Sequence, residues 1–184
     1  MCKWVIGLTS ISCFGSFVWA VKKHFRSDRV IRPGMQAVSF VSLAAIGWFL
    51  FRLQGDDVVW FWPLPLTMMF VSLILFWWAV SETRVQRLTL AFDEDVPEFI
   101  YQTGPYRYVG HPFYNSYFLF WISTCLVTPG LFQWIVPLAL GTAYLTAARR
   151  EERKFAASPV AATYQRYRES RVSLVFLLWR RLAG

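Results

Sequence analysis

One histidine and two neighbouring glutamates have the residue types and the spacing to perform chemistry in this sequence. His111 lies in the stretch TGPYRYVGHPFYNSY, residues 103–117, and Glu151 and Glu152 lie in AARREERKF, residues 147–155. Histidine changes its protonation near neutral pH, and a carboxylate that borders an apolar segment is costly unless a cation meets it. The glutamates could therefore hold a cationic ligand. The plainer alternative is that they end a helix and pair with the neighbouring Arg and Lys side chains, which extend toward water.

The elements that must position these residues are long apolar blocks. Hydrophobic residues make up 56% of the chain, and its mean hydropathy is +0.38, whereas a typical soluble domain is about 45–50% apolar. A helix needs about 17–25 residues to cross the hydrocarbon core of a membrane. The sequence thus predicts an all-α integral membrane protein of one domain, with about five transmembrane helices at residues 4–21, 35–51, 58–80, 112–128 and 131–148.

The distribution of basic residues predicts the topology. With five spans, the segments 22–34, 82–111 and 149–184 lie on one side, and they hold all of the 19 Lys and Arg residues except Lys3 and Arg52. The positive-inside rule then puts the N-terminus outside and the C-terminus in the cytoplasm. A basic face beside anionic membrane lipids accounts for the net charge of +8, so no nucleic-acid partner is expected.

The last two spans are expected to form a helical hairpin, because the sequence Thr-Pro-Gly at residues 128–130 favours a tight turn. The hairpin would bring His111, at the start of one span, close to Glu151, at the end of the other. Adjacent residues of a helix point about 100° apart, so only one of Glu151 and Glu152 is expected to face the shared pocket. Aromatic walls and hydroxyl groups are expected from Tyr106, Tyr108 and Tyr114.

The C-terminal region is expected to add a cytoplasmic helix that folds back over this pocket. Ser158 and Pro159 have the pattern of an N-cap followed by proline at the first helical position. Tyr164, Tyr167 and Arg171 then fall near one face of the helix.

The cysteines predict no metal site and no disulfide framework. Cys2, Cys13 and Cys125 lie in or near apolar segments, with no CxxC pair and no histidine close in sequence. The sequence also contains no P-loop, no GxGxxG and no GxSxG motif.

The combination of GPYRYVGHPFY, then EERKF about forty residues later, then YQRYRESRV resembles the isoprenylcysteine carboxyl methyltransferase family. The wider group includes phospholipid N-methyltransferases of the membrane. The compact five-span form looks more like the microbial members than the longer eukaryotic enzymes, which favours a bacterial cytoplasmic membrane. The resemblance implies S-adenosylmethionine as cofactor and methyl transfer to a lipophilic, membrane-embedded acceptor, with a carboxylate favoured and an amine as the alternative. It also implies that residues 1–99 are a transmembrane scaffold, residues 100–172 the methyltransferase core and residues 173–184 an interfacial tail.

The resemblance also implies roles for individual residues. The cofactor-binding set is Tyr106, His111, Pro112, Phe113, Tyr114 and Glu151, with Glu98, Phe99, Ile100 and Tyr101 from the preceding segment. The catalytic candidates are His111, Arg107 and Glu152, of which His111 or Glu152 would accept the proton of an amine acceptor. Two arginine positions of the family pattern hold Gly110 and Ala147 here, so Arg149 and Arg150 become the substrate-binding candidates.

Two other classes of function stay open at the level of sequence. An NADPH-dependent reductase of the sterol-reductase type has a similar helical arrangement, but His-Pro-Phe-Tyr at residues 111–114 and the Glu pair favour a methyltransferase. A non-catalytic membrane protein that kept the scaffold is the third class, and Gly110 and Ala147 are the residues that favour it.

Overall fold

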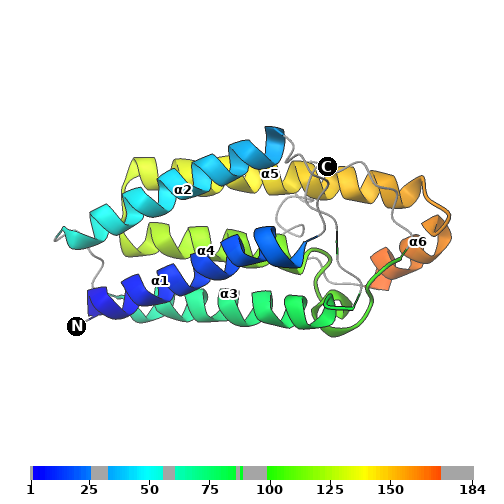
Figure 1. Ribbon diagram of the computed structural model, residues 1–184, viewed down its shortest axis with the longest axis horizontal. Coiled ribbons are helices and arrows are strands. Elements are labelled where there is room, and N and C mark those ends of the chain that lie inside the picture. Colours follow the sequence, from blue (N-terminus) through cyan, green and yellow to red (C-terminus); the bar gives the residue numbers. More distant parts are fainter. Residues whose placement is uncertain (1, 26–32, 56–60, 86–87, 89–98, 171–184) are drawn as a thin grey trace.

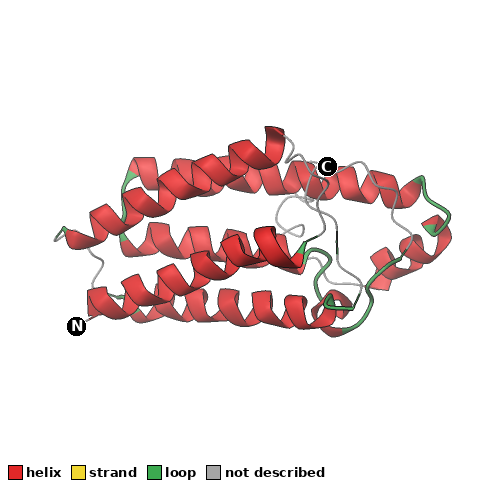
Figure 2. Ribbon diagram, viewed as in Figure 1, coloured by secondary structure: helices red, strands yellow, loops and turns green. Residues whose placement is uncertain are grey.

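Every regular element of the described chain is a helix (Figures 1 and 2). The structure, a computed structural model, describes residues 2–25, 33–55, 61–85, 88 and 99–170. In chain order the elements are α1 (Cys2–Trp19), the π-helical segment η1 (Ala20–His24), α2 (Pro33–Gln54), α3 (Pro63–Glu82), the 3-10 turn η2 (Gly104–Arg107), α4 (Pro112–Val127), α5 (Leu131–Ala156) and α6 (Ala161–Ser170). The prediction of an all-α protein is confirmed for these residues.

Four stretches are long and apolar enough to cross a membrane by length and composition: Cys2–His24, Pro33–Gln54, Pro63–Glu82 and Leu131–Ala156. The expected span at residues 112–128 forms α4, which has only 16 residues, slightly fewer than the roughly 17 that a spanning helix needs. The helix expected over residues 131–148 continues to Ala156, because its charged continuation consists of good helix formers. The helix expected from residue 58 begins at Pro63, where proline suits a first turn.

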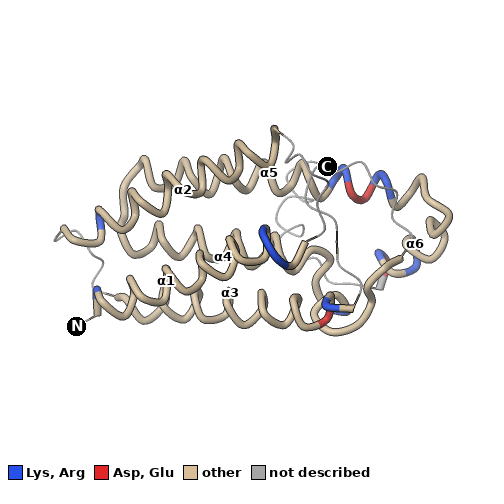
Figure 3. The backbone as a smooth tube through the Cα atoms, in the orientation of Figure 1, with Lys and Arg blue, Asp and Glu red and all other residues tan. Residues whose placement is uncertain are grey.

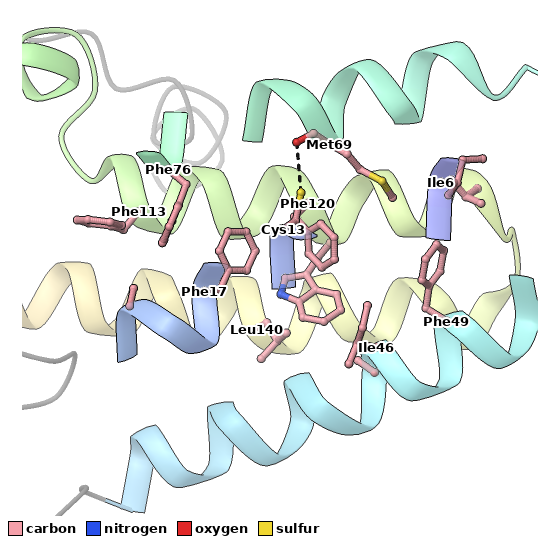
Figure 4. Close-up of a cluster of buried hydrophobic side chains, with 14 of the residues drawn as sticks. Ile6, Cys13, Phe17, Ile46, Phe49, Met69, Phe76, Phe113, Phe120 and Leu140 are labelled. Carbon is pink, nitrogen blue, oxygen red and sulfur yellow. Dashed lines mark hydrogen bonds between the residues drawn. The ribbon is translucent and has the colours of Figure 1, made fainter. Parts of the chain in front are cut away.

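α4 lies in the centre of the bundle, with α1, α3 and α5 packed around it, while α2 packs against α5 and α1 (Figure 1). Its buried Phe120 meets Phe17 of α1 edge to face at 5.5 Å, within the apolar cluster of Figure 4. The outer faces of the other long helices carry exposed apolar side chains, including Trp4, Phe40, Ile74 and Leu138. Extended apolar surface of this kind is suited to contact with lipid.

Charged residues separate toward the two ends of the bundle (Figure 3). Lys3 and Arg52 lie at the end that holds the α4–α5 turn, where Lys3 Nζ donates to Gly55 O at 2.7 Å and Arg52 Nη2 donates to Pro129 O at 3.4 Å. The charged residues at the end of α5 and on α6 lie toward the other end (Figure 3). The described residues thus show the separation of basic residues that the sequence predicts.

The start of α6 differs from the expected N-cap at Ser158 and Pro159. α6 begins at Ala161, and Ser158 Oγ donates to Phe155 O at 2.8 Å. A serine hydroxyl can bond the carbonyl group of an earlier turn of helix instead of capping a new one. Ser158 therefore closes the end of α5.

Candidate functional site

The predicted α4–α5 hairpin is present, and polar contacts brace its turn. Gln133 Nε2 donates to Thr128 Oγ1 at 2.6 Å, and Cys125 Sγ donates to Gln133 O at 2.9 Å. At the other end of α4, His111 precedes Pro112, whose fixed φ and missing N–H suit the first turn of a helix. The hairpin thus places the start of α4 beside the charged end of α5.

Four side chains meet at this end of the hairpin, and we name them the hairpin cluster: His111, Tyr114, Glu151 and Glu152. His111 Nδ1 lies 3.4 Å from Glu151 Oε2, and His111 Nε2 lies 3.6 Å from Glu152 Oε1. The Tyr114 hydroxyl donates to Glu151 Oε1, and the Tyr114 ring stacks on the imidazole at 5.6 Å. The predicted approach of His111 to Glu151 is therefore present.

The expectation that only one glutamate faces the shared site is wrong. Both carboxylates reach the same imidazole, although their residues are adjacent on α5. The two ring nitrogens of His111 point in different directions, and the flexible glutamate side chain can direct its carboxylate away from the direction of its Cβ. The arrangement places a carboxylate within ion-pair distance of each ring nitrogen of His111.

Glu151 is held by donors other than lysine and arginine. Arg149, Arg150, Arg153 and Lys154 all lie within three residues of it, yet in the described part of the chain Glu151 bonds Tyr114 and approaches His111 instead. Its side chain keeps 35% of its surface exposed. A carboxylate has about four lone-pair positions, so Glu151 can accept hydrogen bonds from a further donor.

Tyr106 presents a buried hydroxyl group whose pKa is influenced by the charge of Glu151. The residue is only 7% exposed, and its hydroxyl has no hydrogen-bond partner among the residues that the structure describes. Burial raises the pKa of Tyr106 well above its usual value, and the negative charge of Glu151 adds to this rise, so the hydroxyl stays neutral. Because a buried hydroxyl without a partner is unfavourable, Tyr106 is a candidate for bonding a polar ligand.

α6 returns to the segment that carries Tyr106, as the sequence predicts. The Tyr167 hydroxyl donates a hydrogen bond to Tyr106 O at 2.7 Å. Tyr164 and Tyr167 are buried in a small separate apolar cluster with Ile100. Arg171, the third residue expected on this face, lies outside the described residues.

The residues of the segment before Tyr106, which were expected to line the cofactor, lie in different surroundings. Tyr101 stacks on the Tyr106 ring at 5.4 Å, so it lies beside the site. Ile100 is instead buried against α6, and Phe99 is about half exposed. Glu98 lies outside the described residues.

Pro112 and Phe113 lie behind the hairpin cluster. Both are buried, and the Phe113 ring is 5.0 Å from that of Phe25 and 5.6 Å from that of Phe76. Adjacent residues of a helix point about 100° apart, so Tyr114 meets Glu151 while Phe113 faces the core (Figure 4). Phe113 therefore packs in the core in this structure, and its role in lining the cofactor stays a prediction.

The three arginines of the predicted site, Arg107, Arg149 and Arg150, are exposed, and none belongs to the hairpin cluster. Tyr108, expected as an aromatic wall, is also exposed, and its ring lies 6.2 Å from that of Trp78 on α3. In the 3-10 turn that precedes it, Tyr106 points inward and is buried. Of these two tyrosines, the turn therefore places only Tyr106 in the interior.

Tyr144 was missed by the sequence analysis. Its ring lies parallel to that of Tyr114, with centroids 5.8 Å apart and an interplanar angle of 8°, and Trp121 Nε1 donates to its hydroxyl at 3.3 Å. Tyr144 lies seven residues before Glu151, which places both on one face of α5. That spacing, within an otherwise apolar span, is the signal that could have identified it.

Comparison of the chain with protein-family profiles, with curated proteins and with solved structures finds no significant match. The motifs and the geometry of the described residues therefore carry the functional argument.

Proposed function

We propose that the chain is a membrane methyltransferase that uses S-adenosylmethionine to methylate a lipophilic acceptor. The carrying observation is Glu151, a carboxylate that is held by Tyr114 and His111 and paired with no lysine or arginine among the described residues. At the edge of an apolar hairpin, such a carboxylate is stabilised by a cation. The amino group of S-adenosylmethionine is a cation of this kind, and the motif order supports the same choice.

The residues around Glu151 suit the polar and aromatic groups of this cofactor. Glu151 would accept hydrogen bonds from the ammonium group, and the neutral Tyr106 hydroxyl would bond a second polar group. His111 would orient the cofactor while both glutamates hold its ring. Tyr101 and Tyr114 offer aromatic faces, which attract cationic groups.

When bound, S-adenosylmethionine supplies a methyl group on a positively charged sulfur, and displacement by an acceptor atom leaves a neutral thioether. We favour a carboxylate acceptor. The positive charge of the sulfur and the negative charge of the carboxylate then both diminish in the transition state, so a dry site destabilises the charged reactants more than the transition state. The chain would exclude water and hold the reactants in line. Arg107, Arg149 and Arg150 are its candidates for binding that carboxylate. With an amine acceptor, His111 or Glu152 would accept the proton.

The apolar helices and the separated charges support insertion in a membrane with the N-terminus outside and the charged end of the bundle in the cytoplasm. A reporter fused after Gly184 should then be active only when it requires a cytoplasmic location. A periplasmic signal at the same position would refute this orientation and would separate the hairpin cluster from cytoplasmic cofactor.

The central test is binding of labelled S-adenosylmethionine and labelled NADPH to the purified full-length protein in detergent. We expect saturable binding of S-adenosylmethionine alone. Binding of NADPH alone would instead support a reductase, and binding of neither would support a membrane scaffold. Either result would overturn the proposal.

A further inference from the structure

We propose that Glu82 is a positioning residue, which fixes the turn at Thr103 and Gly104 and thereby the Tyr106 hydroxyl. Glu82 is the last residue of α3, within the part of the chain that the sequence marks only as a transmembrane scaffold. The structural part of this inference stands alone, whereas its effect on the cofactor rests on the proposed function.

The Glu82 carboxylate packs directly against the turn. Thr103 Oγ1 donates to Glu82 Oε1, and a Cβ atom at Gly104 would lie 2.6 Å from Glu82 Oε2, so the carboxylate would have to shift to make room for it. Gly104 also has a φ of 57°, in the left-handed region that favours glycine. The backbone conformation of this turn therefore favours glycine, and the absence of a Cβ lets the carboxylate lie close against the turn.

The position of Glu82 on α3 is locally unfavourable. The C-terminal end of a helix carries partial negative charge, which repels a carboxylate, and α3 has no basic residue in its last turn. Helix stability therefore gives no reason for an acidic residue here. The hydrogen bond from Thr103 offsets this repulsion and gives the carboxylate a role outside its own helix.

A single backbone hydrogen bond connects the turn to Tyr106. η2 packs against the end of α3 (Figure 1), and the Tyr106 backbone N–H donates to Thr103 O at 3.2 Å. Thr103 thus binds Glu82 with its side chain and Tyr106 with its carbonyl group. If Thr103 moves, the backbone of Tyr106 moves with it, which changes the position of the buried Tyr106 hydroxyl.

The first test measures the turn without any ligand. Hydrogen exchange of a peptide covering residues 99–113 would be followed in the full-length protein for Glu82→Ala, Thr103→Ala, the double variant and Glu82→Gln. We expect each alanine variant to speed exchange about 10-fold, with no further increase in the double variant. Glu82→Gln should exchange like the parent protein, because its amide oxygen still accepts from Thr103.

The second test measures affinity for labelled S-adenosylmethionine in the same variants. We expect about 10-fold weaker binding for Glu82→Ala and for Thr103→Ala, and less than about 2-fold for Glu82→Gln. Glu169→Gln is the matched control, because Glu169 is an exposed acid in the last turn of α6, and it should change neither readout.

The outcomes separate this inference from the proposed function. Additive effects in the double variant, equal damage from Glu82→Gln and Glu82→Ala, or unchanged exchange would each overturn the positioning role. If the parent protein fails to bind S-adenosylmethionine while exchange responds as expected, the proposed function fails and the role of Glu82 in holding the turn remains.

Discussion

Of the two histidines of the chain, His24 is buried and His111 is partly buried, and their surroundings differ. His24, at the end of η1, is 4% exposed, and its Nε2 lies 2.7 Å from Thr83 Oγ1. The Thr83 hydroxyl donates its only proton to Ala79 O at 2.8 Å, so His24 must donate to Thr83. The rings of Trp19 and Phe113 lie against His24. His111 has instead a carboxylate beside each ring nitrogen.

The difference shows what makes a buried histidine suitable for chemistry. The hydroxyl acceptor fixes one proton of His24 in place, on a ring that lies among aromatic side chains. Two carboxylates can hold an imidazolium, or can share its proton with a reactant. We therefore propose a structural role for His24, whose described contacts are aromatic rings and a threonine hydroxyl, and a functional role for His111, whose described contacts include two carboxylates.

The largest effect is expected from removal of Glu151, the carboxylate that we propose holds the cofactor. Deleting one member of a partly buried charged pair costs about 2–5 kcal/mol, so Glu151→Ala should weaken S-adenosylmethionine binding roughly 30-fold or more. Glu152→Ala should weaken it less, because Tyr114 bonds Glu151. Affinity and Tm would be measured for both variants. Equal, small losses of affinity in both variants would instead mean that the two glutamates only end the helix and do not bind the cofactor.

Smaller effects are expected when each histidine is replaced by glutamine. Replacement of His111 should mainly reduce cofactor affinity, and replacement of His24 should mainly reduce thermal stability. His111→Gln should weaken cofactor binding about 10-fold with little change in Tm, because it removes a charge-assisted contact at the site. His24→Gln should lower the Tm by about 4–8 °C, for a loss near 2 kcal/mol, and leave affinity within about 2-fold. If His24→Gln lost as much affinity as His111→Gln, the distinction between a structural His24 and a functional His111 would be wrong.

The smallest effect is expected from Tyr106→Phe. The hydroxyl has no partner among the described residues, so its removal should leave the Tm unchanged or slightly higher, while cofactor affinity falls about 3- to 10-fold. Tyr167→Phe is the matched control: it deletes a hydroxyl that bonds Tyr106 O and should lower the Tm. A lower Tm in Tyr106→Phe would mean that the hydroxyl already has a structural partner.

The sequence allows prediction of what depends on local pattern and hairpin closure. The apolar blocks predict the long helices, and the Thr-Pro-Gly turn predicts the approach of His111 to Glu151. It does not predict that Glu152 also reaches His111, because this depends on side-chain torsions that periodicity leaves open. Nor does it predict the burial of Tyr106 beside an exposed Tyr108, which follows from a 3-10 turn packed on α3.

Pairs that are distant in sequence and involve side chains were the least predictable. Glu82 and Thr103 are 21 residues apart, and part of the segment between them lies outside the described residues. No periodic pattern joins them, since the contact forms only when α3 and η2 pack together. Tyr144, by contrast, carries a usable signal, because its spacing from Glu151 lies within one helix.

The unequal lengths of the two hairpin helices have a kinetic consequence. At about 1.5 Å per residue, the 16 residues of α4 extend about 24 Å and the 26 residues of α5 about 39 Å, while the hydrocarbon core is about 30 Å thick. In a bilayer, His111 would thus lie at the edge of the hydrocarbon and within reach of an acceptor that never leaves it. Encounter would then be two-dimensional, governed by the acceptor's mole fraction in the membrane. Diluting the acceptor with inert lipid would slow the reaction, whereas adding buffer at a fixed lipid composition would not.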